Sequence, residues 1–377
     1  MINDFRYLWQ HYADWLIAYK VTAITIAFCC MAFNAWLLQR LRHVGIPQAN
    51  HQTADWVRWA AVPKPAIGGI GFGIAFLLGL LTIFLLLQCG IAIEIPNWQQ
   101  WYSFIAACML GFLVGLIDDM RQISPRYKLA GQLLCAILLV MGGIIIPISD
   151  IMPLNVLFTI CWVVGIMNSL NMLDNMDGIT ASVSLFILLG ILTLAALDGQ
   201  MASAFCVIAV AMLGGLLGFL HYNWHSSRMF MGDAGSQLLG VLLAALSIIY
   251  VWQFRDTEYG IGSLRQLLLP ALLFLLPIID TTTVTLRRLW RGQSPFVGGR
   301  DHTTHHLAYC GLSDTQVALV FVVLSALHLC LVYYVRQYLL TTWQTTHTLL
   351  LMAYMLLLFI LFQVAYEYGK RKKARTS

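Results

Sequence analysis

The stretch IGGIGFGIAFLLGLLTIFLLLQ, Ile67–Gln88, decides what kind of fold this chain adopts. It contains no charged side chain, and a helix that crosses the hydrocarbon core of a bilayer needs roughly 20 mostly apolar residues. By the same criterion we count about eleven apolar runs along the chain. They lie near Trp15–Leu38, Ile67–Gln88, Tyr102–Ile117, Leu129–Ile148, Leu154–Met167, Ile179–Leu197, Ala202–Leu220, Gln237–Val251, Leu267–Val284, Val317–Val335 and Leu349–Val364.

The composition agrees with that interpretation. Of the 377 residues, 60% are hydrophobic and 10% are charged, and the mean hydropathy is +0.77. Soluble domains carry about 25% charged residues. We therefore predict an all-α integral membrane protein, a polytopic helix bundle of about 11 transmembrane helices that forms a single domain over residues 1–377. The nine cysteines show no CxxC spacing, which favours apolar packing over disulfides or a metal site.

Lysine and arginine residues predict the orientation, because they are enriched in cytoplasmic loops. If the N-terminus lies outside, the outer segments hold Arg6, Arg255, Arg265 and Arg336, and Lys20 lies near the outer end of the first run. All the other lysines and arginines are then on the inner side, and so are the carboxylates Asp118, Asp119, Asp174, Asp177, Asp233 and Asp301. We expect the C-terminus, with a basic tail over 368–377, to lie in the cytoplasm, and the active-site loops to lie at that face.

Two adjacent carboxylates, Asp118 and Asp119, end one apolar run within the segment Gly115–Lys128. Charged groups at membrane depth are costly and are functional candidates by default. Such a pair suits a divalent cation, or one acid can accept a proton. The alternative is a solvated helix end.

A second polar segment, Asn168–Gly178, places a polar side chain at every third position. On a helix this spacing keeps Asn168, Asn171, Asp174 and Asp177 on one broad face. Amide and carboxylate oxygens suit a hard cation such as magnesium. The alternative is a polar helix end that lines a water-filled vestibule. Gly178 would let the backbone approach a ligand closely.

The third segment, Asn223–Ser236, places Asp233 between two glycines just before an apolar run. Glycines at a helix start expose backbone N–H groups, which predicts a phosphate site there. Phe230 either stacks on a base or anchors the chain at the membrane interface.

The fourth segment, Leu286–Leu307, is the longest inner loop. Its arginines and histidines favour phosphate binding; they are Arg287, Arg288, Arg291, Arg300, His302, His305 and His306. A zinc site is the alternative. It is less favoured because zinc needs Cys or His ligands that close a tetrahedron, and Cys310 is the only thiol nearby. Asp280, after Pro277, either supports the site or caps a helix. Outside these segments, the pairs Gly111/Gly115 and Gly214/Gly218 predict close helix packing.

Taken in order, these segments resemble the motifs of the polyprenyl-phosphate N-acetylhexosamine-1-phosphate transferases, glycosyltransferase family 4. The shared pattern comprises Pro-Lys-Pro followed by Gly-Gly, the Asp-Asp pair followed by Lys128, Asn-x-x-Asn-x-x-Asp-x-x-Asp-Gly, Phe-Met-Gly-Asp-x-Gly-Ser and a His-rich loop. It spans residues 63–307. Within the family the chain resembles the undecaprenyl-phosphate GlcNAc-1-phosphate transferase branch.

The resemblance implies a magnesium-dependent transferase, with manganese as an alternative cation, in the inner membrane. The phosphate of undecaprenyl phosphate attacks the β-phosphate of a UDP-N-acetylhexosamine, expected to be UDP-GlcNAc. UMP leaves, and the lipid-linked product starts cell-surface glycan assembly. Membrane lipid and a second copy in a homodimer are further implied partners, and no nucleic acid is expected.

The resemblance also implies roles, residue by residue. One of the acids Asp118 and Asp119 is the implied base or activator of the lipid phosphate. Catalytic positions are Asp118, Asp119, Asp174, Asp177, His302, His305 and His306. Substrate-binding positions are Lys64, Lys128, Gly178, Asn223, Phe230 and Arg300, where Lys64, Gly178, Asn223 and Phe230, together with Asp177, match a uridine pocket. Metal-binding positions are Asn171, Asp174 and Asp233.

Two departures from the family pattern bear on the donor. The loop reads Asp-His-Thr-Thr-His-His-Leu, whereas the peptidoglycan-precursor branch tends to carry three consecutive histidines. This disfavours a UDP-MurNAc-pentapeptide donor. The Gly-Gly-Arg-Asp-His run resembles the branch that starts O-antigen, teichoic-acid or exopolysaccharide assembly, and a modified UDP-N-acetylhexosamine is a further alternative. Asn175 stands where Gly is frequent and is expected to narrow the pocket or add a hydrogen bond.

A polytopic secondary transporter is the alternative from another functional class. Transporters carry charged groups near the bilayer midplane on broken helices, often within inverted repeats. The polar segments of this chain lie at the ends of apolar runs, and no internal repeat is evident, which favours the enzyme.

Overall fold

The computed structural model describes residues 2–43, 64–252, 264–294, 299–339 and 343–376. Of the residues used above, Arg58, Pro63, Arg255 and the loop positions 295–298 lie outside this part. The described chain is helical, with two isolated β-bridges. The helices are α1 (Ile2–His43), α2 (Gly68–Gln88), α3 (Trp98–Arg121), α4 (Pro125–Met141), α5 (Met152–Leu173), α6 (Ile179–Leu197), α7 (Ala204–Asn223), α8 (Gly232–Tyr250), α9 (Leu264–Leu273), α10 (Leu275–Trp290), α11 (Thr303–Tyr309), α12 (Asp314–Tyr334), a short π-helix (Val335–Leu339) and α13 (Thr345–Thr376).

Nine of the described helices are long and apolar enough to cross a membrane, or ten if the bent pair α9–α10 counts as one span. Every predicted apolar run coincides with one of these helices, with the bent pair, or with α4. α4 has 17 residues, which corresponds to roughly 25 Å of helix. The protein is therefore a polytopic helical membrane protein, and the total of about eleven spans stays a prediction.

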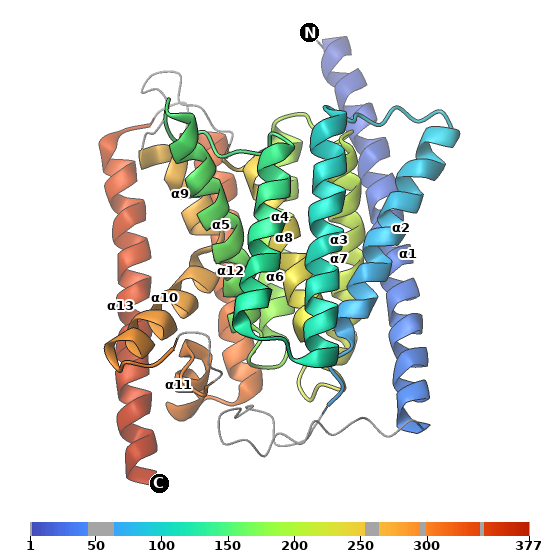
Figure 1. Ribbon diagram of the computed structural model, residues 1–377. Coiled ribbons are helices and arrows are strands. Elements are labelled where there is room, and N and C mark those ends of the chain that lie inside the picture. Colours follow the sequence, from blue (N-terminus) through green and yellow to red (C-terminus); the bar gives the residue numbers. More distant parts are fainter. Residues whose placement is uncertain (1, 44–63, 253–263, 295–298, 340–342, 377) are drawn as a thin grey trace.

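The apolar run Leu267–Val284 forms two helices and not one continuous helix. α9 ends at Leu273, α10 begins at Leu275, and the two axes meet at 79°. Pro277 explains the break, since it has no N–H to donate to the carbonyl of Leu273 and its ring clashes with that carbonyl. After the bend, α10 runs obliquely across the lower part of the bundle toward α13 (Figure 1).

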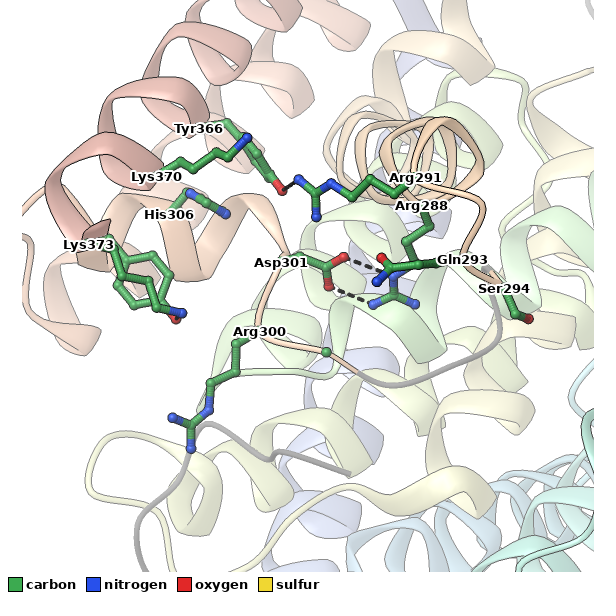
Figure 2. A pocket seen from close by; sticks show the side chains of 12 residues that line it. Arg288, Arg291, Gln293, Ser294, Arg300, Asp301, His306, Tyr366, Lys370 and Lys373 are labelled. Atoms are coloured by element: carbon green, nitrogen blue, oxygen red, sulfur yellow. Dashed lines mark hydrogen bonds and ion pairs between the residues drawn. The ribbon is translucent and has the colours of Figure 1, made fainter. Parts of the chain in front are cut away.

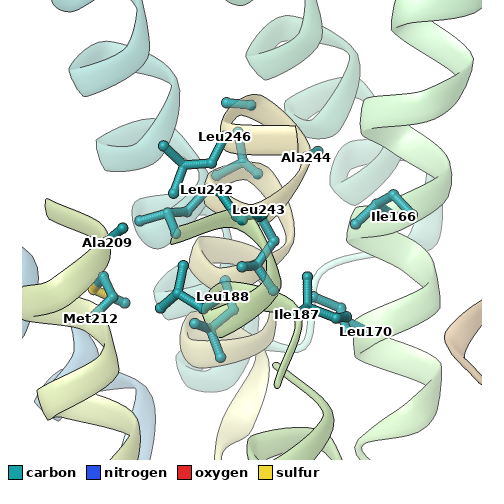
Figure 3. Packing of buried hydrophobic residues seen from close by; sticks show 14 of the residues in the cluster. Ile166, Leu170, Ile187, Leu188, Ala209, Met212, Leu242, Leu243, Ala244 and Leu246 are labelled. Carbon is teal, nitrogen blue, oxygen red and sulfur yellow. The ribbon is translucent and has the colours of Figure 1, made fainter. Parts of the chain in front are cut away.

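α8 is the central helix of the bundle. Every residue from Ala234 to Ile248 is buried, and the helix contacts α2, α3, α5 and α6. Its leucines Leu242, Leu243 and Leu246 belong to the hydrophobic cluster drawn in Figure 3, together with side chains of α5, α6 and α7. α13, by contrast, exposes a long apolar face. The termini lie at opposite ends of the bundle, and the four polar segments gather at the end where α13 finishes (Figure 1).

Small residues allow two close helix contacts. Gly111 and Gly115 of α3 lie against α8, where a Cβ on Gly115 would overlap the carbonyl oxygen of Asp233. Gly214 and Gly218 of α7 lie against the backbone of α1. The prediction that both pairs serve helix packing is confirmed, and the first pair brings α3 directly against the start of α8.

Candidate active site

Lys128, near the start of α4, is the centre of the first polar cluster. Its ammonium nitrogen lies 2.9 Å from Asp118 Oδ2 and 2.6 Å from Asp233 Oδ1. It also donates to Asn171 Oδ1 at 3.2 Å, and the amide of Asn171 donates to Asp233 and to Ser236. The four helices α3, α4, α5 and α8 thus bring their polar side chains to one cation surrounded by oxygen atoms.

Asp119 has a different environment from its neighbour Asp118. Its two carboxylate oxygens accept hydrogen bonds from the backbone N–H groups of Asp233 and Ala234, each at 2.8 Å. Asp119 of α3 therefore caps the N-terminus of α8. The expectation that these N–H groups are ready to bind a phosphate is wrong, because the carboxylate of Asp119 already occupies them.

A layer of amides lies one helical turn deeper in the bundle. Gln132 in α4 exchanges hydrogen bonds with Asn168 in α5 at 2.8 and 3.2 Å, and donates to Gln237 Oε1 in α8 at 3.0 Å. Gln132 and Gln237 are almost fully buried. Each of the three helices therefore places one amide directly beneath its member of the Lys128 cluster. Since buried polar groups are stable only when they are hydrogen-bonded, this layer fixes the relative positions of the three helices.

The residues predicted to form the uridine pocket meet in a second cluster. Lys64 lies 2.9 Å from Asp177 Oδ2, donates to Ser227 Oγ at 2.8 Å, and its nitrogen lies 5.3 Å from the centre of the Phe230 ring. Ser227 donates to Asp177 Oδ1 at 2.7 Å. A parallel β-bridge between Ala66 and Phe230 holds the two segments together. A cation, a carboxylate and an aromatic ring thus share one small site.

Gly178 and Asn223 complete this cluster. Asn223 Oδ1 accepts from the N–H of Gly178 at 3.0 Å, and its amide donates to the carbonyl of Met229 at 2.9 Å. Gly178 has a φ of +77°, a conformation that glycine adopts without steric cost. A Cβ at this position would also lie 3.2 Å from the ring of Trp224. Glycine at position 178 thus suits both this backbone conformation and the contact with Trp224, and the close approach of the backbone to a ligand stays a prediction.

Asp280 organises the His-rich loop from inside the bundle. It is fully buried, lies 2.8 Å from His302 Nδ1, and accepts from Thr303 N at 2.8 Å and Thr303 Oγ1 at 2.6 Å. Asp280 therefore both supports His302 and caps α11. Thr304 donates to Asn175 Oδ1 at 2.6 Å. The hydrogen bond expected of Asn175 thus joins α11 to the loop that carries Asp174 and Asp177.

His305 and His306 are buried in α11, and both are neutral at pH 7. Burial and, to a smaller extent, the nearby His302 lower the pKa of His305 to about 3. Burial likewise lowers the pKa of His306 to about 4. Burial alone would raise the pKa of Asp301, but the two hydrogen bonds and the charge of Arg288 lower it overall. These two histidines therefore act as neutral groups.

The structure extends the predicted site by side chains that sequence reasoning did not select. Ser227 and Ser236 lay inside the quoted segments, but hydroxyl groups are too frequent in loops to stand out. Gln132 and Gln237 lay in apolar runs that predicted only membrane spans, and Tyr366 lies just beyond the last of these runs. Among the predicted residues, Asp174 is the C-terminal cap residue of α5, and Arg300 precedes α11 in an exposed position.

The Lys128 cluster has the donor chemistry that a magnesium ion requires. In the described part of the chain, no three His, Cys, Asp or Glu side chains are grouped closely enough to hold a metal. Magnesium, however, is usually bound through one or two carboxylates and keeps several waters or substrate oxygens. Asp118, Asp233 and Asn171 already direct oxygen atoms at a cation, the ammonium group of Lys128. The residues present therefore fit magnesium.

Comparison with known proteins shows the family of this chain. Residues 101–251 match the model of glycosyl transferase family 4. A decaprenyl-phosphate N-acetylglucosaminephosphotransferase of Mycolicibacterium smegmatis is 30% identical over 329 residues, which cover 75% of this chain and 79% of the relative. The chain belongs to glycosyl transferase family 4.

Other similar proteins differ in the transferred sugar group that their names give. A probable undecaprenyl-phosphate N-acetylglucosaminyl 1-phosphate transferase of Bacillus subtilis is 28% identical over 274 residues, covering 70% of this chain and 74% of the relative. A phospho-N-acetylmuramoyl-pentapeptide-transferase of Desulfitobacterium hafniense is 32% identical over 299 residues, covering 71% and 82%. The matched family region contains three of the four polar segments, from Asp118 to Asp233.

Proposed function

We propose that this protein transfers N-acetylhexosamine-1-phosphate, with GlcNAc-1-phosphate as the group, from a UDP-sugar to undecaprenyl phosphate and releases UMP. The observation that carries the proposal is the position of Lys128, held by Asp118, Asp233 and Asn171 where four helices end. Relatives named for polyprenyl-phosphate acceptors and N-acetylglucosamine groups support it.

The reaction is a phosphoryl transfer, in which positioning and neutralisation of charge dominate catalysis. An oxygen of the lipid phosphate attacks the β-phosphorus of the donor. The bond from that phosphorus to the bridging oxygen breaks, and UMP leaves with the bridging oxygen. The ammonium group of Lys128 is the cation around which these negative oxygens gather.

The two adjacent acids take different parts in this proposal. Asp118 faces Lys128, so we assign to it the activation of the lipid phosphate. Asp119 holds the start of α8 and thereby the backbone of Asp233. When bound by Asp118, Asp233 and Asn171, magnesium would neutralise the diphosphate and polarise its phosphorus. Asp174, one helical turn beyond Asn171, completes the proposed metal set.

The second cluster is proposed to bind the nucleotide. Phe230 offers a ring on which a base can stack, and Asp177 and Ser227 fix Lys64 beside that ring. The α5–α6 segment carries Asp177 together with Asn171, and the α7–α8 segment carries Phe230 together with Asp233. A donor bound at the second cluster would therefore extend its diphosphate toward the first.

The proposed setting is the inner membrane, with the N-terminus outside and the C-terminus in the cytoplasm, as the distribution of lysine and arginine favours. A site at helix ends lets a nucleotide sugar arrive from the cytosol and a lipid phosphate arrive within the bilayer. The proposal includes assembly into a homodimer.

The test uses the purified full chain in detergent with undecaprenyl phosphate and a panel of UDP-sugars, and follows UMP release with and without magnesium. Magnesium-dependent release with UDP-GlcNAc is expected. Release only with UDP-MurNAc-pentapeptide or a modified UDP-N-acetylhexosamine would support the proposed reaction but identify a different donor. Folded protein that releases no UMP with any donor would overturn the proposal and favour the secondary transporter instead.

A further inference from the structure

A cavity lies between the end of α10, the loop before α11, and the cytoplasmic end of α13. Its volume is about 610 Å³, within the range of pockets that hold small molecules. Figure 2 shows that its side chains come from three parts of the chain, with Arg288 from α10 and Arg291 directly after it, and with Tyr366, Lys370 and Lys373 from α13. Neither α13 nor its basic tail belongs to the segments that predicted the active site.

The charged side chains that line the cavity are mostly positive. Five lysine and arginine side chains line it, and its one carboxylate, Asp301, binds Arg288 through two hydrogen bonds of 2.9 and 2.6 Å. His306 also lines it, is neutral at pH 7, and has a ring nitrogen, Nδ1, with no hydrogen-bond partner among the described residues. A concave surface lined by like charges focuses its potential and concentrates anions.

The end of α13 is fixed against α11 and is not a free tail. The ring of Tyr366 stacks on His306 with 3.5 Å between the ring centres. The guanidinium carbon of Arg287 lies 3.8 Å from the centre of the same Tyr366 ring. Gly369 lets the helix touch the carbonyl of His306, where a Cβ would overlap that oxygen. Lys372 donates to the carbonyl of Cys310 at 3.0 Å.

Two of the lining cations are held at the cavity by tyrosine hydroxyls. Arg291 donates to Tyr366 Oη at 3.4 Å, and Lys373 donates to Tyr309 Oη at 3.0 Å. These partners are neutral, so they orient the two cations without cancelling their charge. Arginine and lysine arranged in this way are typical of phosphate recognition.

We propose that this cavity binds a phosphate group of a phosphorylated ligand, and that α13 forms one wall of the site through Lys370 and Lys373. The phosphate can belong to a soluble diphosphate such as that of the nucleotide donor, or to the headgroup of an anionic lipid. The assignment to the donor rests on the proposed function, whereas the anion site itself rests on the cavity and its charges.

The test compares two variants of the full chain that remove charge from the same helix. Lys370→Gln combined with Lys373→Gln removes the lining cations, and Arg371→Gln, which does not line the cavity, is the matched control. UDP binding is measured by calorimetry in detergent. The rate of UMP release is then measured in vesicles of phosphatidylcholine alone and with phosphatidylglycerol added.

The double variant is expected to bind UDP at least tenfold more weakly than the Arg371→Gln control, which identifies the donor diphosphate as the ligand. Unchanged UDP binding with loss of the response to phosphatidylglycerol, in the double variant alone, would identify a lipid headgroup instead. If the wild-type protein binds UDP, and the double variant and the control behave alike in both measurements, the anion site is overturned. A wild-type protein that neither binds UDP nor releases UMP would instead count against the proposed transferase, so the two failures are distinguishable.

Discussion

Asp119 holds Asp233 through the backbone, since the carboxylate of Asp119 accepts the N–H of Asp233 at 2.8 Å. The neighbouring Asp118 instead binds Lys128 by its side chain, at 2.9 Å. These two acids are adjacent in sequence but have different contacts. One determines where the start of α8 lies, and the other faces the cation at the centre of the site.

This difference predicts distinct phenotypes for the two asparagine variants. Asp118→Asn should keep the thermal stability of the protein and lose turnover by at least about a hundredfold, as expected when a charged catalytic group is removed. Asp119→Asn should lower stability by about 1–3 kcal/mol, because an amide offers one acceptor where two N–H groups need one each. Thermal unfolding and UMP release check both, and normal activity in Asp118→Asn would refute its role.

Removing the central cation should uncover the acidic groups around it. In Lys128→Met, Asp118 and Asp233 face each other without the ammonium group, and their mutual repulsion destabilises the protein. We expect turnover to be lost, a lower melting temperature without magnesium, and a larger rise on adding magnesium than in the wild-type protein. Arg371→Met, at an exposed position on α13, should show none of these changes. An equal magnesium response in both variants would contradict a cation site here.

Gly115 should tolerate no side chain. A Cβ there would overlap the carbonyl oxygen of Asp233, so Gly115→Ala must push α3 from α8. We expect a loss of about 1–3 kcal/mol, typical of overpacking, and a fall in activity because Asp233 moves. The matched control is Gly165→Ala in α5, where a Cβ meets nothing within 4 Å. Comparable effects of the two alanines on activity would show that the contact is unimportant.

The amide layer should matter for stability even though it carries no charge. Gln132→Leu leaves Asn168 and Gln237 without their shared partner, at a cost of about 1–3 kcal/mol for unsatisfied buried polar groups. Leu134→Ala, on an exposed part of the same helix, serves as the control. Unfolding in detergent measures the difference in stability. A Gln132→Leu variant as stable as the control would show that the amide layer does not contribute to stability.

The buried histidines predict a pH dependence of stability. The pKa of His306, lowered to about 4 by burial, is below the ordinary value of 6.5. The unfolded chain therefore binds a proton before the folded chain does, so stability is lost as the pH falls from about 6.5 toward 4. The lowered pKa of Asp301 acts only below its ordinary value of 3.8. In His306→Phe, which retains an aromatic ring, the melting temperature should fall less between pH 7 and 5 than in the wild-type protein.

The membership of the second cluster was predicted from the family resemblance. The resemblance grouped Lys64, Asp177, Gly178, Asn223 and Phe230, and the structure brings these five residues together. The break between α9 and α10 could not be placed, since an apolar run containing prolines is compatible with a kinked span. The amide layer was also hidden, because single glutamines within apolar runs give no signal until three helices are packed together.

Apolar length and charge placement were enough to predict the apolar helices, apart from the break between α9 and α10, and the end of the bundle that carries the polar groups. Apolar length and the placement of charge are local properties, and the bilayer acts on each segment separately. The tertiary structure alone decided which acid faces Lys128, which acid caps α8, and that Tyr366 near the C-terminus stacks on His306. These relationships join residues distant in sequence, and they arise only because glycine contacts and buried hydrogen bonds fix how the helices pack.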